Sequence, residues 1–188
     1  MALREIINGC LENNQRDYKR LYEDFYGYSL KIVFRYIYRY DKAVDVVNDG
    51  FVKVLGKLNM FRCEPSQNLE MLFKGWLRTI MINTAIDRLR KDSFLPEIGI
   101  TNEFWIEDKS QSADQSLLYK DLITQVKKLP PAYRIVFNMY VIDGYTHQEI
   151  ANQLHVEVGT SKSNLSKAKA ILREHLRKID EQLQICNM

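Results

Sequence analysis

The segment from Leu129 to Arg177 constrains the fold of this chain most strongly, because residues that start and stop helices follow one another there at short intervals. Pro130 and Pro131 remove backbone amide donors and disfavour helix in the residue that precedes each of them. Residues 132–142 are apolar on nearly every side, which is typical of a buried helix. Gly144 is suited to the left-handed conformation that ends such a helix.

A second helix is predicted directly afterwards. Thr146 and Glu149 have the spacing of a capping box, in which each side chain bonds the backbone amide of the other residue. The helix that they open ends near Leu154, and His155 follows in the turn, where histidine tolerates a left-handed backbone better than most residues. A last helix is expected over residues 158–179. Two helices joined by a tight turn indicate a helix-turn-helix.

The last of these helices has an apolar side and a basic side. Its apolar residues recur at intervals of three and four and predict one buried stripe, made of Leu165, Ala168, Leu172, Leu176 and Ile179. The opposite side carries Lys162, Ser163, Ser166 and Lys167. Short Ser and Thr side chains let a backbone approach a DNA groove, and lysines contact phosphate or guanine. The pattern favours a DNA-reading helix, with a solvated basic face as the alternative.

This segment resembles a known family. Residues 145–154 (YTHQEIANQL) and 159–168 (GTSKSNLSKA) are similar to region four of bacterial sigma factors, most of all to the extracytoplasmic-function (ECF) group. The resemblance implies that duplex promoter DNA is contacted by Thr160, Lys162, Ser163, Ser166 and Lys167. Many transcriptional regulators share a helix-turn-helix, so the first half of the chain has to distinguish between the two classes.

The first half shows helical periodicity almost throughout. A short helix is expected over residues 3–13, and apolar residues at helical spacing predict a longer one from Asp17 to Tyr40. One flank of that helix carries a basic row, Lys31, Arg35 and Arg39. A second long helix starts at Asp41 to Ala43, and its predicted buried side consists of Ala43, Val46, Val47, Phe51, Val54 and Leu58.

The other side of this second helix carries Asp45, Asn48 and Asp49 at i, i+3 and i+4. Paired carboxylates can bind a metal or act as acid and base, but no histidine accompanies them, and a solvated or interacting face has the same spacing. Residues 43–51 (AVDVVNDGF) are similar to the region-two helix by which sigma factors grip the clamp of core RNA polymerase. The resemblance implies that Asp45, Asn48 and Asp49 bind the polymerase. The chain departs from the family at Val44, Asn48 and Asp49, where Glu, Gln and Glu are commoner.

A third long helix is expected from Met71 to Lys91, after a polar loop over residues 59–70. Residues 73–78 (FKGWLR), Asn83 and residues 87–90 (DRLR) resemble the part of region two that captures the downstream (−10) promoter element as a single strand. The resemblance implies this role for Asn83, Arg88, Arg90 and Lys91. An asparagine offers a donor and an acceptor to a flipped base, and cations anchor the phosphates. A bond to local backbone is the alternative for Asn83, and Trp76 is expected in the core.

Charge divides the chain into three parts. The net charge is +4 over residues 1–95, −4 over residues 96–115 and +3 over residues 116–188. Two basic blocks on either side of an acidic connector suggest two domains that face nucleic acid, and ordinary surface charge is the alternative for the first block. We expect an all-α fold with two small helical domains, 1–95 and 114–188, joined by a linker over 96–113. Phe104 and Trp105 make this linker too apolar for a purely flexible tether, and a helix from Leu117 to Leu129 is expected to open the second domain.

No residue pattern points to catalysis, a cofactor or a metal site. The three cysteines, Cys10, Cys63 and Cys186, are far apart and lack a histidine at metal-ligand spacing, which predicts reduced thiols. No apolar run approaches membrane-spanning length, and the N-terminus has no signal-peptide core. The protein is therefore expected to be soluble and cytoplasmic.

The two resemblances cover residues 16–91 and 114–178, in the order that the family requires. Together they indicate an ECF-type sigma factor, a promoter-specificity subunit without catalytic chemistry of its own. The implied partners are core RNA polymerase, promoter DNA and, by the family alone, an anti-sigma factor. The free protein is expected to be a monomer. The main alternative is a one-component helix-turn-helix regulator, in which residues 1–95 form a sensing or dimerising domain.

Overall fold

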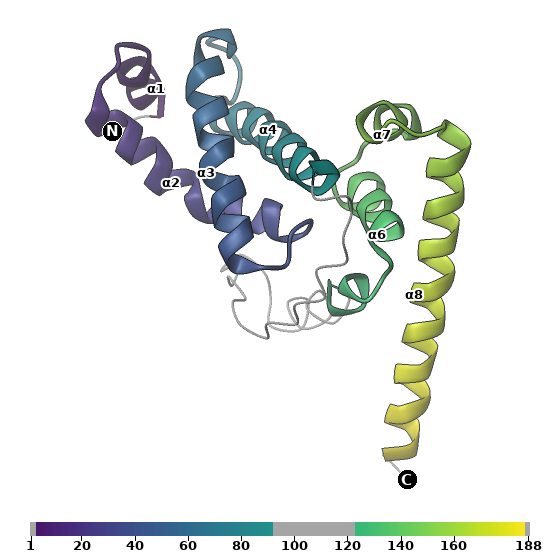
Figure 1. The fold of residues 1–188 in the computed structure, drawn as a ribbon. Coiled ribbons are helices and arrows are strands. Elements are labelled where there is room, and N and C mark those ends of the chain that lie inside the picture. Colours follow the sequence, from purple (N-terminus) through teal and green to yellow (C-terminus); the bar gives the residue numbers. More distant parts are fainter. Residues whose placement is uncertain (1–2, 92–122, 187–188) are drawn as a thin grey trace. The chain divides into compact units, whose positions relative to one another are not determined.

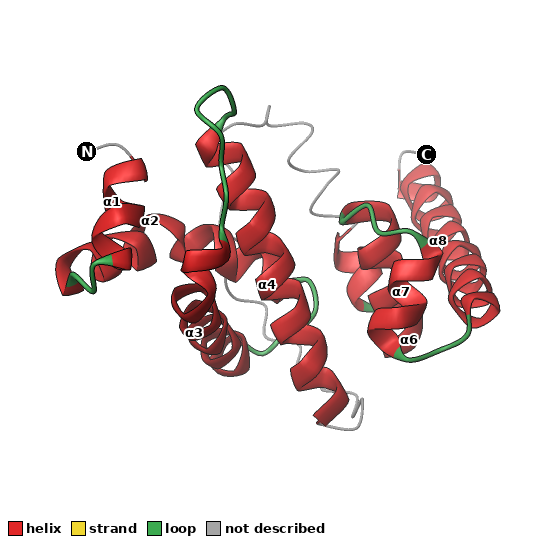
Figure 2. Ribbon diagram, turned by 90° about the horizontal axis from the view of Figure 1, so that it is seen from above, coloured by secondary structure: helices red, strands yellow, loops and turns green. Residues whose placement is uncertain are grey.

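The computed structural model describes residues 3–91 and 123–186 of the protein, with side chains as far as residue 178 in the last helix. The chain divides into two compact units, Met1–Ile106 and Glu107–Met188. Every regular element among the described residues is helical (Figures 1 and 2), which confirms the all-α class. None of these helices is both long enough and apolar enough to cross a membrane. The expected linker over residues 96–113, including Phe104 and Trp105, lies outside the described residues.

The first unit is a bundle of helices. In the part that the structure describes it contains α1 (Leu3–Leu11), α2 (Gln15–Phe34), α3 (Tyr40–Lys57), the 3₁₀ turn η1 (Leu58–Met60) and α4 (Leu69–Lys91). Helices α2, α3 and α4 pack against one another, and α1 packs against α2 (Figure 1). The predicted inner side of α3 is confirmed, because all six of its apolar residues are buried: Ala43, Val46, Val47, Phe51, Val54 and Leu58.

The helix predicted from Asp17 to Tyr40 is wrong at its C-terminal end. Helix α2 stops at Phe34, and Tyr40 already belongs to α3. Tyr36 and Ile37 are buried although they lie beyond the end of α2, so they form a corner that belongs to the core. Arg39 has an extended backbone and pairs with Asp41 at 2.8 Å. The predicted basic row is therefore not one row on one helix.

Gly50 allows a close approach of α3 to α4. A Cβ atom at this position would collide with the Sδ atom of Met81 on α4. Met81 is fully buried, so its side chain has little room to move away. A glycine in the middle of a helix costs roughly 1 kcal/mol relative to alanine. The packing of α3 on α4 explains why this cost is accepted here.

Phe61 fastens the loop between η1 and α4 to the helix that follows it. Its ring centroid lies 5.4 Å from that of Phe73 and 5.3 Å from that of Trp76. Phe73 also meets Phe25 of α2 at 4.9 Å. Tilted and edge-on aromatic pairs at these distances are favourable. Trp76 is thus a half-buried member of an aromatic cluster at the edge of the core, less covered than the core position that the sequence predicts.

The second unit is a smaller helical group. Its described part begins with a helical segment at residues 123–127, followed by α6 (Pro131–Phe137), the π-helical turn η2 (Asn138–Ile142), α7 (His147–Leu154) and α8 (Val158–Cys186). Both α6 and α7 pack against α8. Fully or almost fully buried apolar side chains join these elements: Val126, Leu129, Ile135, Val136, Met139, Ile150 and Ala168.

Two expectations for the second unit need correction. Asn138 and Met139 are buried but Tyr140 and Val141 are exposed, so the segment predicted to be buried on nearly every side is buried on only one side in its π-helical last turn. Helix α8 continues to Cys186 instead of ending at residue 179. Leu176 was expected in the buried stripe but is 41% exposed. The reason is that α8 runs on past α6 and α7 (Figure 1), so the stripe outlasts the surfaces that cover it.

The packing at Gly50 yields a prediction about stability. Gly50→Ala should lower the free energy of unfolding by up to about 2 kcal/mol, because overpacking a core costs about 1–3 kcal/mol and the gain in helix propensity offsets only about 1 kcal/mol of this. Gly27, also inside a helix, has no atom within 4 Å of an added Cβ and provides the control. Gly27→Ala should stabilise the protein by up to ~1 kcal/mol. Urea unfolding of both variants measures the difference, and equal stabilisation by both would contradict the packing argument.

Candidate nucleic-acid and protein interfaces

Helix α3 presents Asp45, Asn48 and Asp49 to solvent, and we call these residues the α3 polar face. The inner side of the same helix is buried, so the three side chains share the side that faces outward. Val52 follows at i+3 from Asp49 and is 71% exposed, which extends the face by one apolar residue. No group of three His, Cys, Asp or Glu side chains in the described residues could hold a metal ion.

Tyr22 on α2 holds one residue of the α3 polar face. Its hydroxyl donates a hydrogen bond of 2.9 Å to Oδ1 of Asn48. Its ring packs against Phe51 at 4.8 Å and Tyr26 at 5.2 Å. Burial, with a smaller effect from Tyr40, raises the pKa of Tyr22, so the hydroxyl keeps its proton and remains a donor. The amide of Asn48 is therefore oriented from the neighbouring helix.

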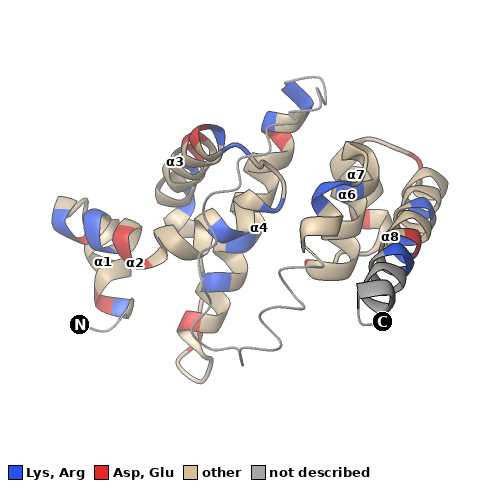
Figure 3. Cartoon of the chain, turned by 90° about the horizontal axis from the view of Figure 1, so that it is seen from below, with Lys and Arg blue, Asp and Glu red and all other residues tan. Residues whose placement is uncertain are grey.

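The C-terminal end of α4 carries the residues predicted to bind a single strand, and we call Asn83, Arg88, Arg90 and Lys91 the α4 basic end. Figure 3 shows Lys and Arg gathered at this end of the helix, with an acidic residue among them. Lys91 is exposed, whereas Arg88 and Arg90 are half-buried. The helix thus brings the predicted cations together within its last two turns.

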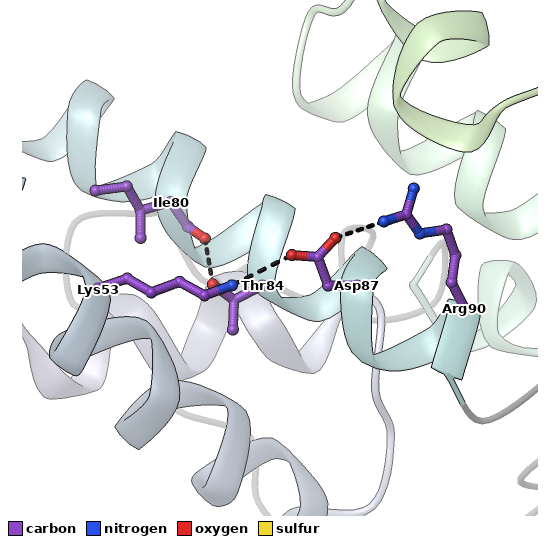
Figure 4. Close-up of polar contacts among 5 residues, drawn as sticks. All are labelled: Lys53, Ile80, Thr84, Asp87 and Arg90. Atoms are coloured by element: carbon purple, nitrogen blue, oxygen red, sulfur yellow. Dashed lines mark hydrogen bonds and ion pairs between the residues drawn. The ribbon is translucent and has the colours of Figure 1, made fainter.

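An ion-pair network crosses from α3 to the α4 basic end. Asp87 accepts a hydrogen bond from Nζ of Lys53 at Oδ2, over 3.2 Å, and from Nη2 of Arg90 at Oδ1, over 2.9 Å. Figure 4 shows the carboxylate of Asp87 between these two cations. Nearby, the buried hydroxyl of Thr84 donates to the carbonyl oxygen of Ile80 at 2.8 Å. The carboxylate therefore joins a cation from each helix.

Asn83 is half-buried, and the structure turns its acceptor inward. Its Oδ1 atom is shielded from solvent and has no hydrogen-bond partner among the described residues. A buried amide oxygen without a partner is unfavourable. For this atom to meet a base, the side chain has to rotate outward, and the missing partner makes such a rotation less costly.

We call α7, the turn at His155 and the first turn of α8 the α7–α8 joint, and local contacts define both ends of its first helix. The capping box at the start of α7 is confirmed, because Thr146 Oγ1 accepts from the amide of Glu149 at 3.2 Å and the amide of Thr146 donates to Glu149 Oε2 at 2.8 Å. These bonds from Thr146 lower the pKa of Glu149. His155 ends α7 with φ of 55°, the left-handed conformation that the sequence predicted for the turn.

His147 connects the first turn of α7 to the first turn of α8. Its Nδ1 atom lies 2.9 Å from Oγ of Ser161, which is fully buried. Its ring stacks on Tyr140 with centroids 4.4 Å apart and an angle of 24°. Burial first, and then the positive charges of Lys162 and Lys169, lower the pKa of His147. The neutral ring is therefore the form that the folded joint favours.

The outward side of the N-terminal half of α8 carries the residues predicted to read duplex DNA. All five are exposed, and we call them the α8 basic face: Thr160, Lys162, Ser163, Ser166 and Lys167. The ammonium group of Lys167 lies 5.8 Å from the centroid of the Tyr133 ring, within the range of a cation–π contact. Lys162 has no such contact in the described residues. The two lysines are thus held differently.

The sequence did not predict that three further residues, Tyr22, Lys53 and His147, support these surfaces. Tyr22 fits the apolar pattern of α2, and nothing in that pattern shows that its hydroxyl reaches Asn48. Lys53 stands alone in sequence, 34 residues from Asp87. His147 lies inside the recognised motif, but its contact with Ser161 requires the fold of the turn. Val52 was also not predicted, but here the sequence did contain the signal: its i+7 spacing from Asp45 places it on the same side of α3 as the polar face.

Comparison with protein families gives two matches, one in each unit. Residues 21–94 match the family model described as Sigma-70 region 2, and residues 119–172 match the one described as Sigma-70, region 4. The first match contains the α3 polar face and the α4 basic end, and the second contains the α8 basic face. Together the two matched ranges span well over half of the chain.

Individual proteins agree with the family matches. The chain is 28% identical to RNA polymerase sigma factor SigV of Bacillus subtilis, over 94% of this chain and 95% of that protein. It is 23% identical to the ECF RNA polymerase sigma factor SigW of the same organism, over 94% of this chain and 98% of that one. Among solved structures, sigma factor RpoE in complex with anti-sigma factor NepR from Bartonella quintana has a TM-score of 0.50. Its sequence is 24% identical, and the match covers 86% of this chain and 98% of that chain, which supports the fold.

The lowered pKa of His147 predicts a pH dependence of the joint. The unfolded chain takes up the proton near pH 6.5, whereas the folded joint takes it up only at lower pH. The stability that the neutral ring contributes is thus present above about pH 6.5 and is lost as the pH falls through the folded pKa. Protection of the α7 amides against hydrogen exchange, corrected for the intrinsic pH dependence of exchange, should therefore fall on acidification in the wild type and less so in His147→Asn. His155→Asn, at an exposed site, is the control, and an equal response in all three proteins would contradict the prediction.

Proposed function

The chain belongs to the sigma-70 family of RNA polymerase sigma factors, in its ECF group, and from this we propose that it binds core RNA polymerase and directs it to specific promoters. The observation that carries the proposal is the order of the two family matches, region 2 in the first compact unit and region 4 in the second. A one-component regulator is not favoured. That hypothesis assigns the first unit to ligand sensing or dimerisation, whereas this unit matches Sigma-70 region 2.

In this proposal the α3 polar face binds the polymerase. The face combines two carboxylates with an amide whose orientation is set by Tyr22, and Val52 adds an apolar contact at its end. Charged groups at an interface improve the rate and specificity of association, while apolar groups add affinity once they are covered. The exposure of all four side chains in the free protein supports this role.

The two basic surfaces take the two forms of promoter DNA. We propose that the α8 basic face enters the major groove of the duplex, since it is exposed, cationic and built from short side chains near the start of the second helix of a helix-turn-helix. We propose that the α4 basic end holds the downstream element after the strands separate. Its cations anchor phosphates there, and Asn83 offers its amide to an unstacked base.

Neither surface is expected to suffice alone. A single helix with a few lysines reaches little beyond non-specific affinity, on the order of 10⁻⁴–10⁻⁶ M at physiological salt. The α4 basic end gains nothing from closed duplex, because unstacking a base costs a few kcal/mol. Core polymerase supplies the missing affinity by holding both domains at once, which makes the second contact effectively intramolecular.

The remaining assignments follow from this role. The domains are taken as residues 1–95 and 114–188 with a linker over residues 96–113, and the free protein is taken as a monomer. An anti-sigma factor is a further proposed partner, implied by the family. The polymerase carries out the chemistry, so the chain itself supplies no catalytic residue, cofactor or metal. This role is exercised in the cytoplasm, where the polymerase works.

A mobility-shift titration with and without core polymerase tests the proposal. Promoter fragments are first obtained by selecting genomic DNA on the reconstituted holoenzyme and are checked by run-off transcription. We expect specific binding by the holoenzyme and only weak binding by the free chain. Tight, sequence-specific binding of the free chain to sites with two-fold symmetry would refute the sigma-factor role and support the regulator.

Reversing charge on the α3 polar face should weaken polymerase binding. In the double variant Asp45→Lys with Asp49→Lys, like charges at the contact cost several kcal/mol if they are juxtaposed. The matched control is Glu12→Lys with Asp24→Lys, two exposed residues of the same unit, which changes the net charge equally. Pull-down of core polymerase by the folded proteins measures the effect, and equal binding by both double variants would rule the face out.

The two lysines of the α8 basic face should differ in what they read. Lys162→Ala is expected to cost ~1–3 kcal/mol and to relax the preference at one base pair, if Lys162 is bidentate to a guanine. Lys167→Ala should weaken all sequences alike, as for a phosphate contact. Lys178→Ala, beside Glu174, serves as the control. Sequencing of promoters selected by each holoenzyme is the measurement, and unchanged profiles after Lys162→Ala and Lys167→Ala together would place specificity elsewhere.

A further inference from the structure

We propose that Asp87 acts as an internal counter-ion of the α4 basic end, where its carboxylate competes with DNA phosphates for Lys53 and Arg90. By this competition Asp87 limits the affinity of the surface for single strands of any sequence. The inference rests on the proposed function, because it concerns the surface that holds the opened promoter strand. It adds two residues to that surface, Lys53 as a cation and Asp87 as its restraint.

The placement of the three charges carries the inference. Asp87 lies on the same side of α4 as Asn83, four residues earlier, and Arg90, three residues later. A carboxylate in the middle of a strand-binding stripe repels phosphate. Both of its oxygens are occupied, Oδ2 by Lys53 at 3.2 Å and Oδ1 by Arg90 at 2.9 Å (Figure 4). A phosphate that approaches this stripe therefore has to compete with Asp87 for both cations.

The cluster remains open to exchange. The side chains of Lys53, Asp87 and Arg90 are 41%, 37% and 33% exposed. Ion pairs this exposed are weak, because water solvates the separated charges almost as well. An ammonium group has three donors, and Asp87 engages one donor of Lys53 in the described structure. Lys53 can therefore turn to a phosphate oxygen while it stays near Asp87, and the balance between the two anions sets the affinity.

A purely structural role for the network predicts a different result. If Lys53 and Asp87 mainly tied α3 to α4, then removal of the carboxylate would loosen the surface and weaken DNA binding. The two helices are already joined by buried packing around Gly50 and Met81, which does not depend on the charges. The counter-ion role predicts the opposite sign, since loss of the carboxylate removes the anion that competes with DNA for both cations. The direction of the change therefore separates the two roles.

The experiment measures the binding of holoenzyme to two labelled DNA forks over a range of salt concentrations. One fork is a selected promoter whose downstream element is single-stranded, and the other has the same single-stranded length in scrambled sequence. Asp87→Asn should bind both forks about fivefold more tightly at low salt, as expected for a unit charge removed at about 4 Å in water. The salt dependence should steepen by about 0.7 for each cation that gains a phosphate of a single strand.

Charge-matched variants complete the test. Lys53→Gln should bind both forks more weakly, with a salt dependence shallower by about 0.7. The double variant Lys53→Gln with Asp87→Asn should bind nearly as the wild type does, because the net charge of the cluster is restored. Asp87→Glu retains the counter-ion and should change little. Asp24→Asn removes a carboxylate from an exposed site on α2 and controls for net charge, while Arg4→Gln on α1 does so for a lost cation.

The outcomes distinguish the inference from the function on which it rests. Weaker or unchanged binding by Asp87→Asn, in a protein that melts as the wild type does, would overturn the counter-ion role. Weaker binding together with a lower melting temperature would also overturn it and assign Asp87 to structure. A wild-type holoenzyme that does not distinguish the two forks would contradict the proposed function. The response of Asp87→Asn on the scrambled fork tests the counter-ion role even in that case.

Discussion

The approach of α3 to α4 at Gly50 is the contact on which the surfaces of the first unit depend. Because Gly50 has no side chain, the side chain of Met81 on α4 packs directly against the backbone of α3. The inner side of α3 is fully buried there. That burial determines which side of α3 faces solvent, and this side carries the polar face. The same approach brings Lys53, one turn beyond Gly50, within reach of Asp87. A single missing Cβ atom thus sets the positions of two separate surfaces.

Local chemistry made much of the fold predictable from the sequence. The capping box at Thr146 depends on two residues three apart, and the left-handed turn at His155 depends on one, so both were predictable without knowledge of the rest of the chain. The inner side of α3 was predictable for a similar reason, since a helix in a bundle buries the residues that recur every three or four positions. The predicted site residues on α3 and α8 are all exposed, as an interface requires.

The failures arose where distant parts of the chain decide the outcome. The apolar periodicity predicts that the helix continues past Tyr36. Tyr36 is indeed buried, but it lies in the corner after α2 and not in a helix. The same pattern cannot show that Leu176 lies beyond the elements that cover α8. Contacts such as Tyr22 with Asn48 and Lys53 with Asp87 join different helices, and each depends on a crossing that no local pattern encodes.

The π-helical turn η2, which follows α6, supports the start of α7 in the second unit. The amide of Asp143 bonds the carbonyl of Asn138, five residues earlier, at 2.9 Å. Such a turn is the equivalent of one extra residue within an α-helix, and it rotates the residues that follow by about 100°. Tyr140 lies in this turn, exposed, with its ring against His147. The π-helical turn thus holds the ring that supports the start of α7, and a related chain with a regular helix here would need a different support for the start of α7.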